Sequence, residues 1–305
     1  MRKFEESKTG PGTTADERLV GADPAVSDPL GPARDGVLEP SLGTPLETPA
    51  GKGPLDLPPG AGSIHDALFA NKRGRIDDFN FGRDTAVVFD DMLGRSVPYY
   101  AEIQRMTSEL IGDFAQDGTS IYDLGCSTCT TFLETTAYLS PETQLRFIGI
   151  DNSTEMLEIA GRKLQENRFA WPYELRYGDL NEGVLIENAS VVLLVLTLQF
   201  VRPLRRERLV RTIQEGLTDS GCLILVEKVL GENSTFNRLF INHYYEMKRR
   251  NGYSELEISQ KREALENVLI PYRLEENREL LRRCGFNNVD VFFKWYNFCA
   301  IIATK

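Results

Sequence analysis

The stretch that decides the fold is Ser120-Ile-Tyr-Asp-Leu-Gly-Cys-Ser127, which is followed by Phe147-Ile-Gly-Ile-Asp-Asn152. The first apolar run ends at Gly125 before a loop of small residues, and the second ends at Asp151. Glycine lets a backbone approach a ligand closely, and a carboxylate after the next strand accepts hydrogen bonds from ribose hydroxyls. The two runs therefore predict a nucleotide-type cofactor at the carboxyl edge of a parallel sheet.

The spacing of these residues favours one class of cofactor. The glycines do not form G-x-G-x-x-G, and Asp151 follows Gly125 by 26 residues. A loop that cradles the cationic S-adenosylmethionine is therefore favoured over a helix N-terminus aimed at a pyrophosphate. Asp179 follows another apolar run and is a candidate for the adenine side. Helix capping is the alternative role for both aspartates, and an ordinary strand–turn–helix unit is the alternative interpretation of the motif.

Apolar runs alternate with amphipathic segments through most of the chain, after an aromatic and charged lead-in at 79–100. Strands are predicted at 120–124, 146–151, 173–177, 190–198, 222–229, 288–296 and 298–304, and helices from about 128 and at 154–166, 205–216 and 275–284. The alternation predicts an α/β protein with a doubly wound sheet. The last two runs are separated only by Asn297, so we expect an antiparallel pair that closes the sheet.

The alternation breaks after the fifth strand. Residues 236–250 fit one helix, and the capping box Ser254-Glu-Leu-Glu257 opens a second helix that ends near Pro271. We expect these two helices to form an insertion at 232–272. An insertion at this point of the chain can cover the carboxyl ends of the strands, where the cofactor is expected.

Composition separates an N-terminal segment from the rest of the chain. Residues 1–62 hold ten of the fifteen prolines and one aromatic residue, Phe4, and show no apolar period. Such a segment cannot bury enough apolar surface to offset its ordering entropy. We therefore expect a disordered arm at 1–62 and an S-adenosylmethionine-binding domain at 63–305. The arm lacks the apolar core of a signal peptide and is too acidic for a typical transit peptide.

Charge and hydropathy narrow the expected partners. The formal net charge is −10 at pH 7, and a strongly acidic chain is a poor general ligand for nucleic acid. The run Lys248-Arg-Arg250 is interpreted as the solvated end of a helix, with a local basic patch as the alternative. No apolar run approaches the ~20 residues of a membrane span, so we expect no membrane partner.

Cysteine usage predicts a reducing, cytoplasmic location, because the five cysteines show no disulfide-scaffold spacing. Cys126 and Cys129 form a C-x-x-C inside the predicted cofactor loop. Packing beside the ligand is favoured over redox activity for this pair. With two histidines and no paired Cys/His clusters, we expect no metal site.

Arg262 is singled out by helix geometry. Ile258, Arg262, Leu265 and Leu269 fall at helical spacing, which would place a guanidinium within an apolar stripe. A buried charge requires a partner, since desolvating it alone costs several kcal/mol. That partner is either a structural carboxylate, such as Glu227 or Glu246, or the carboxylate of a ligand, which Arg binds in planar bidentate geometry.

The most specific motif of the chain is the long run Asn251-Gly-Tyr-Ser-Glu-Leu-Glu-Ile-Ser-Gln-Lys-Arg262. It is accompanied by Arg95-Ser-Val-Pro-Tyr-Tyr100, Tyr122-Asp-Leu-Gly-Cys-Ser127, Ile150-Asp-Asn-Ser153, Glu187-Asn-Ala-Ser190 and Thr197-Leu-Gln-Phe200. Through these motifs the region from about 79 to 305 resembles the carboxy-S-adenosyl-L-methionine synthase family, once described as a tRNA wobble-uridine methyltransferase. The N-terminal arm lies outside the resemblance.

The resemblance implies a class I methyltransferase (Rossmann-like) fold with an antiparallel C-terminal strand and a helical insertion after strand five, usually in a homodimer. It implies that S-adenosylmethionine and prephenate become carboxy-S-adenosylmethionine and phenylpyruvate. In the mechanism it implies, the sulfonium methyl loses a proton and the ylide captures carbon dioxide released from prephenate. A separate enzyme then uses the product to modify the wobble uridine of tRNA.

The resemblance also implies the site residues by motif position. The cofactor site would be lined by Tyr100, Gly125, Cys126, Ser127, Asp151, Asn152, Asp179 and Leu180. Arg262 would hold the new carboxylate, and Arg262 and Tyr100 are the candidate catalytic residues. A packing role is the alternative for Tyr100.

Two positions depart from the family pattern. Val195 stands where familiar members carry an Asn that contacts the cofactor, and Cys129 stands where the loop normally has a further Gly. The first removes a polar contact, and the second is expected to add bulk beside the ligand. Another small carboxylate donor, a plain methyltransferase acting on a small molecule or tRNA, and a non-catalytic S-adenosylmethionine-binding protein therefore stay open as alternatives.

Overall fold

The computed structural model describes residues 65–305, so the predicted arm at 1–62 lies outside the described residues. In the described part, seven strands form one sheet in the order β3-β2-β1-β4-β5-β7-β6. Their bounds are β1 Thr119–Leu124, β2 Leu145–Asp151, β3 Tyr173–Tyr177, β4 Ala189–Val195, β5 Leu217–Lys228, β6 Asn288–Trp295 and β7 Phe298–Thr304.

The strand directions confirm the predicted fold class. Strands β1 to β5 pair in parallel, whereas β7 runs antiparallel to both β5 and β6. From β1 the chain first adds strands on one side, β2 and β3, and then continues on the other side with β4 and β5. In such sheets a crevice for a ligand opens beyond the carboxyl ends of the strands at the point where the direction of addition changes. This arrangement is the class I methyltransferase fold.

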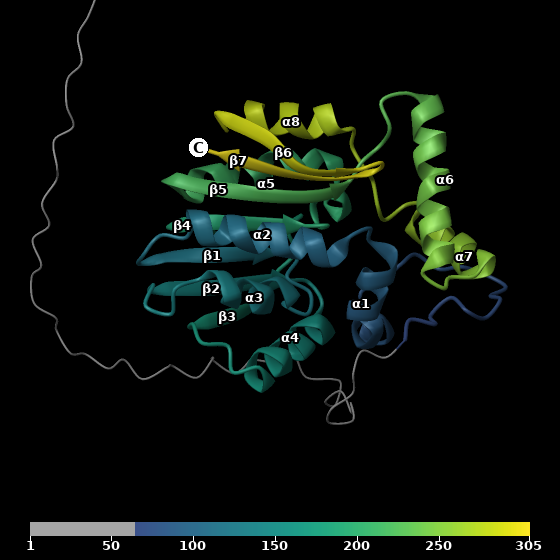
Figure 1. Cartoon of the computed structure of the whole chain (residues 1–305), viewed down its shortest axis with the longest axis horizontal. Helices are drawn as coiled ribbons and strands as arrows, with labels where there is room; N and C mark the ends of the chain where they lie inside the picture. Colours follow the sequence, from purple (N-terminus) through teal and green to yellow (C-terminus); the bar gives the residue numbers. More distant parts are fainter. Residues whose placement is uncertain (1–64) are drawn as a thin grey trace, which may run out of the picture. The chain divides into compact units, whose positions relative to one another are not determined.

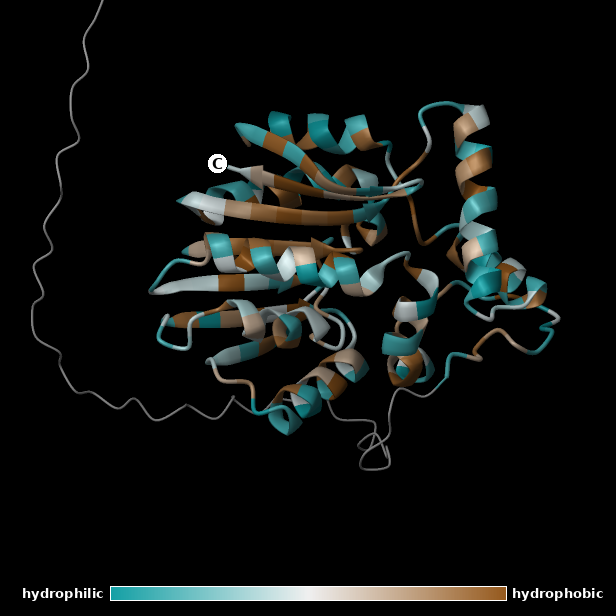
Figure 2. Cartoon of the chain, viewed as in Figure 1, coloured by the Kyte–Doolittle hydropathy of each residue, from teal (hydrophilic) through white to brown (hydrophobic). Residues whose placement is uncertain are grey.

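Helices cover both faces of the sheet (Figure 1). Their bounds are α1 Arg83–Ser96, α2 Tyr100–Phe114, α3 Thr130–Thr135, α4 Thr154–Glu166, α5 Pro203–Gly216, α6 Ser234–Arg250, α7 Glu255–Leu265 and α8 Leu274–Arg283. Successive strand residues point to opposite faces. Tyr122 and Leu124 pack with α5 and α8, while Ile121 packs with α2, α3 and α4. Figure 2 shows the brown, apolar run along the central strands β4 and β5.

The helical insertion follows β5, as predicted from the sequence. Helices α6 and α7 occupy it, and Figure 1 shows them with α1 beyond one end of the strands. The capping box of α7 is present, with the Ser254 hydroxyl accepting from the Glu257 amide and the Glu257 side chain accepting from the Ser254 amide. Helix α7 ends at Leu265, however, and does not continue to Pro271. Beyond it the chain forms isolated turns, in which the Glu266 amide donates to the Glu263 carbonyl and the amides of Val268 and Leu269 donate to the Leu265 carbonyl.

Two other elements differ from the prediction. The lead-in at 79–100 contains α1, which the mixed aromatic and charged pattern did not reveal because its buried face also carries Thr85 and Ser96. The apolar run at 190–198 leaves the sheet at Val195, because Leu196 adopts a left-handed φ of 59° and a 3-10 turn begins at Leu198. Within 65–305, every helix is too short or too polar to cross a membrane.

Candidate functional site

A cavity lies at the carboxyl edge of the parallel strands, between the strand ends and the helices α1, α6 and α7. Eight of the nine predicted site residues line it: Tyr100, Gly125, Cys126, Ser127, Asp151, Asn152, Asp179 and Leu180. The sheet thus brings together residues that are up to 80 positions apart in the chain. Arg262 is the exception.

The loop after β1 depends on Gly125. Gly125 has a φ of 79°, and its amide donates to the carbonyl of Ile150 at 2.7 Å. A Cβ at this position would lie 2.5 Å from the side chain of Thr197. Any other residue at this position would adopt an unfavourable φ and collide with Thr197, so the loop that forms the cavity wall would have to move.

Asp151 joins the first loop to the second. Its Oδ2 accepts from the Ser127 amide and its Oδ1 accepts from the Ser153 amide, both at 2.9 Å. Burial raises the pKa of this carboxyl, and the backbone donors oppose the rise. A carboxylate has about four acceptor positions, so two remain for ribose hydroxyls. Helix capping falls to Ser153, whose hydroxyl accepts from the Met156 amide at 3.1 Å.

Asp123 is a pocket residue that the motif analysis quoted but did not select. It lies on β1 next to Asp151 and lines the cavity, and its Oδ1 has no hydrogen-bond partner within residues 65–305. Burial, with a smaller contribution from Asp151, raises the pKa of Asp123 to about 7. An orphaned buried carboxyl of this kind suits a cationic ligand group, such as the α-ammonium of a methionine moiety. Its position directly before Leu124-Gly125 was the available signal.

The far end of the cavity is formed after β3. Asp179 Oδ1 accepts from the amide and from the side-chain nitrogen of Asn181, at 2.9 and 2.8 Å. Asp179, Leu180 and Asn152 line the cavity from the ends of neighbouring strands. This places them on the β2–β3 side of Gly125, where the prediction put the adenine.

Tyr100 begins α2 and reaches the cavity from the other side. The Gln104 side-chain nitrogen donates to its hydroxyl oxygen at 2.9 Å. Burial, and then the charge of Asp90, raise the pKa of this phenol above its usual range. Tyr100 therefore stays protonated at neutral pH, and its own hydroxyl proton is free for a hydrogen bond into the cavity.

The prediction that Arg262 lies on the buried face of its helix is wrong. The side chain is exposed, and it does not line the cavity. Neither proposed carboxylate, Glu227 nor Glu246, contacts it, and no partner for it is found within residues 65–305. Lys261, the preceding residue, occupies the inner face and is 5% exposed.

The reason lies in the packing of α7. The apolar stripe required Leu269, which the helix does not include because it ends at Leu265. The segment before α1 also covers part of α7, where the Gln260 side chain donates to the carbonyls of Phe69 and Asn71 at 2.9 Å. The helix is therefore turned so that Gln260 and Lys261 face inward.

Three lysines line the same cavity, and sequence reasoning selected none of them. Lys228 ends β5, Lys248 lies on α6, and Lys261 lies on α7. Lys248 is 4% exposed, so the interpretation of the run 248–250 as a solvated helix end is wrong for its first residue. Arg249 and Arg250 are exposed, as predicted.

The two positions that depart from the family pattern are placed differently. Val195 lines the cavity at the end of β4. Cys129 does not line it and is fully buried against the core, so the expectation of added bulk beside the ligand is wrong. Cys129 has a φ of 56°, which explains why glycine suits this position.

The cavity contains one cysteine of the C-x-x-C pair. Cys126 lines the cavity, and both Cys126 and Cys129 are free thiols. Within the described residues, no group of three or more His, Cys, Asp or Glu is arranged to hold a metal ion.

Comparison of the sequence with known proteins identifies the family of this chain. A model of a methyltransferase domain matches residues 121–221. A protein of Methylococcus capsulatus named carboxy-S-adenosyl-L-methionine synthase is 58% identical over 240 residues, which cover 79% of this chain and 99% of the relative. A protein of Desulfotalea psychrophila with the same name is 41% identical, with 79% and 97% covered.

A solved structure shows the same fold at low sequence identity. An S-adenosyl-L-methionine-dependent methyltransferase from Methanococcus maripaludis superimposes with a TM-score of 0.50 at 17% identity. The match covers 75% of this chain and 95% of that one.

Proposed function

The chain is a transferase that belongs to the carboxy-S-adenosyl-L-methionine synthase family, and on that premise we propose that it converts S-adenosylmethionine and prephenate to carboxy-S-adenosylmethionine and phenylpyruvate. The observation that carries the proposal is the single cavity that combines a nucleoside end with a cationic end. Asp151 and Asp179 line the first, and Lys228 and Lys248 line the second.

The residues at the nucleoside end fit S-adenosylmethionine. Asp151 has acceptor capacity left for the ribose hydroxyls, and the unpaired oxygen of Asp123 suits the α-ammonium. Gly125 lines the cavity from the β1 loop, where its backbone can approach the sulfonium closely because the residue has no side chain. When bound, this molecule would supply the activated sulfonium methyl.

The proposed reaction balances without another reactant. Prephenate loses carbon dioxide and its ring hydroxyl, and becomes the aromatic phenylpyruvate. The methyl carbon loses a proton and forms a carbon–carbon bond to the carbon dioxide, and the released hydroxide takes up that proton as water. The protein's part is to hold both substrates in a water-poor cavity, because free carbon dioxide would otherwise diffuse away.

Tyr100 is the pocket residue placed to orient the reacting groups. Its protonated hydroxyl accepts from Gln104 and can donate one hydrogen bond into the cavity. We assign it the role of a hydrogen-bond donor to a ligand carboxylate.

Arg262 remains our candidate for holding the new carboxylate, although it cannot do so from its exposed position on its own chain. The family resemblance supports a homodimer, and an exposed arginine on one copy can reach the ligand of a second. We therefore propose that Arg262 acts across a homodimer interface.

We further propose that the enzyme acts in the cytoplasm and supplies a separate enzyme that modifies the wobble uridine of tRNA. The net charge of −10 supports a small-molecule role over direct contact with tRNA. A methyltransferase acting on a small molecule or tRNA is the second candidate, favoured by Val195 at a position where the family has a polar contact.

Mass spectrometry of the ligand that copurifies with the protein tests the proposal. We expect a ligand about 44 Da heavier than S-adenosylmethionine, the mass of one carbon dioxide, since a product bound to the native state is retained through purification. A protein that carries only S-adenosylmethionine, and forms no carboxylated product when given prephenate, would favour the second candidate.

A further inference from the structure

We propose that Lys228 and Lys248 form the binding site for the carboxylate that the donor substrate keeps when it releases carbon dioxide. The inference rests on the proposed function and names the part of the cavity that would recognise the donor. The ligand class is a small dicarboxylate.

Both lysines are built into the cavity wall. Lys228 reaches it from the end of β5, and Lys248 from the last turn of α6. Their side-chain nitrogens each lie 4.9 Å from the centroid of the Tyr244 ring, so one aromatic residue contacts both. Lys248 is 4% exposed, so its charge is withdrawn from solvent.

Neither ammonium group has an ion-pair or hydrogen-bond partner within residues 65–305. The Glu227 carboxylate, one residue earlier on β5, interacts instead with the charge of Arg206. The Tyr244 ring offers only a cation–π contact, which offsets part of the cost of desolvating an ammonium ion. Two unpaired lysine side chains on the wall of one cavity are the arrangement expected of a site for an anion.

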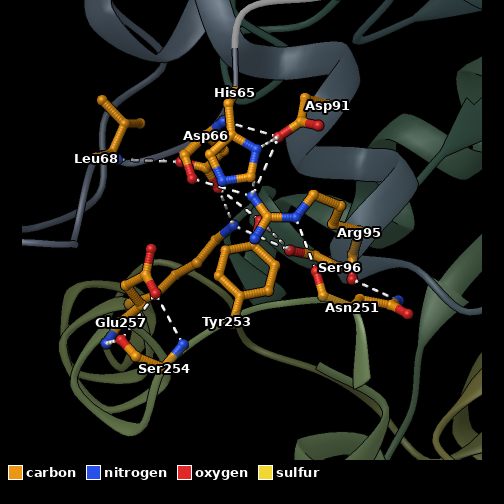
Figure 3. Close-up of polar contacts among 11 residues, drawn as sticks. His65, Asp66, Leu68, Asp91, Arg95, Ser96, Asn251, Tyr253, Ser254 and Glu257 are labelled. Carbon is orange, nitrogen blue, oxygen red and sulfur yellow. Dashed lines mark hydrogen bonds and ion pairs between the residues drawn. The ribbon is translucent and has the colours of Figure 1, made fainter. Parts of the chain in front are cut away.

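The third lysine provides a contrast, because it has a partner. Lys261 lies 3.5 Å from the carboxylate of Asp66, which also accepts from the Tyr253 hydroxyl at 2.6 Å. Figure 3 shows Asp66, Arg95 and Tyr253 meeting where the segment before α1, the helix α1 and the loop before α7 come together. The Asp66 carboxylate is thus engaged in holding these elements.

Burial lowers the pKa of Lys228 to about 8 and holds the pKa of Lys248 well below its usual range. The charges of Lys261 and Lys228 add to the effect on Lys248, and the charge of Asp66 opposes it. A bound carboxylate would favour the charged form of both groups.

The two lysines lie at the end of the cavity where the carboxyl donor would bind, and not at the end where the nucleoside would bind. Ribose and adenine are expected over β2 and β3, whereas Lys228 ends β5 on the far side of β1 and β4. Neighbouring strands are about 4.8 Å apart, so Lys228 lies on the order of 10 Å from the β1 loop. This distance leaves room for a small molecule between the lysines and the sulfonium.

Chemistry decides which donor carboxylate the lysines hold. A carboxylate paired with ammonium groups is stabilised as an anion, which would slow its loss as carbon dioxide. The lysines therefore hold the pyruvyl carboxylate of prephenate, which remains in phenylpyruvate. The ring carboxylate is left unpaired near the sulfonium methyl.

Binding measurements on the full chain test the inference. We would titrate prephenate, and separately malonate, into protein saturated with S-adenosylhomocysteine, which has no transferable methyl. Lys228→Met and Lys248→Met should each weaken prephenate binding at least about tenfold, and weaken malonate binding likewise. Affinity for S-adenosylhomocysteine should change less than about twofold in both variants.

The matched control is Lys294→Met. Lys294 also lies over an aromatic ring, 5.5 Å from the centroid of Phe240, but it is exposed and outside the cavity. Its substitution should leave prephenate and malonate binding unchanged. Thermal unfolding gives a second readout, since Lys248→Met should hold or raise the melting temperature by removing a buried amino group that has no hydrogen-bond partner in the described residues. Lys261→Met, which strands the Asp66 carboxylate, should lower it.

The outcomes separate this inference from the proposed function. Carboxy-S-adenosylmethionine formation from prephenate with undiminished binding by both lysine variants would overturn the inference and leave the function standing. Malonate binding that depends on the two lysines, in a protein that does not accept prephenate, would support the site and refute the donor. A folded protein that binds neither anion, or a large loss of stability in Lys248→Met, would also overturn the inference.

Discussion

The carboxyl groups of Asp123 and Asp151 face one cavity from neighbouring parallel strands, but only one of them is satisfied by the protein. Asp151 accepts two backbone amides, whereas Asp123 keeps an oxygen without a partner in the described residues. Burial and the nearby Asp151 raise the pKa of Asp123 to about 7. The pair therefore combines a fixed acceptor for neutral hydroxyls with a group that a cationic ligand would ionise.

Asp123 should make S-adenosylmethionine binding depend on pH. The ionised carboxylate pairs with the ligand ammonium, so affinity should rise as pH increases through about 7, the pKa of Asp123 in the free protein. Asp123→Asn should bind at least about tenfold more weakly at pH 8 and show little pH dependence. Calorimetric titration at pH 6 and pH 8 measures both effects. Equal pH dependence in the variant would assign the effect to another group.

The same residue should affect the stability of the ligand-free protein. Its folded pKa of about 7 exceeds the ordinary 3.8, so the native state holds an extra proton between these values. The stability that this group contributes is therefore greatest below pH 3.8 and falls as pH rises toward 7, by on the order of 4 kcal/mol in total. Asp123→Asn should flatten this dependence in urea unfolding at pH 5 and pH 8. A variant that loses stability equally at both values would show a packing role instead.

Asp151→Ala should remove most affinity for S-adenosylmethionine. Charge-assisted hydrogen bonds to two ribose hydroxyls contribute about 1.5–3 kcal/mol each, and the two loops also lose the carboxylate that joins them. Asp117→Ala is the matched control, because Asp117 accepts from the Gln144 amide at the opposite edge of the sheet. A dissociation constant unchanged in folded Asp151→Ala protein would refute the assignment.

Arg262→Ala should weaken binding of carboxy-S-adenosylmethionine at least about tenfold more than binding of S-adenosylmethionine, which has no carboxylate on its sulfonium carbon. Arg262→Lys should rescue only in part, because an ammonium group cannot form the bidentate pair. Since Arg262 is exposed, neither variant should unfold. Mixing Arg262→Ala chains with chains defective at Asp151 tests the interface directly. Restored activity in the mixture requires an arginine that acts across copies.

Deleting residues 1–62 should leave melting temperature and cofactor affinity nearly unchanged, because that segment has no apolar face to dock. Deleting residues 1–73 should be strongly destabilising. It removes Asp66, which is 1% exposed and pairs with Lys261, and it removes the carbonyls that Gln260 contacts. A large loss in the shorter deletion would show that the arm packs on the domain.

The sheet and the cofactor loops could be predicted from the sequence because local patterns encode them. The predicted strand at Tyr173–Tyr177 and the predicted helix at Thr154–Glu166 have the same bounds in the structure. In both segments the apolar pattern, the length and the residues at the ends favour the same element. Asp151 and Gly125 were found for the same reason. Residue type and position after a strand suffice to place a side chain at the carboxyl edge.

The cationic end of the cavity could not be predicted, because it depends on how α6 and α7 cross the strand ends. Lys248 precedes two exposed arginines, and the sequence alone does not distinguish it from them. Lys261 takes the inward place expected for Arg262, because the buried face of α7 passes through Ile258 and Lys261, which are three residues apart, and a helical face accepts a spacing of three as readily as a spacing of four. The segment that covers this part of α7 lies almost 200 residues earlier in the chain.

Isotopic labelling of prephenate tests whether its ring carboxylate becomes the carboxylate of carboxy-S-adenosylmethionine. The purified protein is incubated with S-adenosylmethionine and with prephenate that carries an isotopic label only in its ring carboxylate, and the nucleoside products are weighed by mass spectrometry. We expect carboxy-S-adenosylmethionine that contains the label, formed in equal amount with phenylpyruvate. Labelled carbon dioxide released without any carboxylated nucleoside, or a methylated acceptor with no use of prephenate, would contradict it.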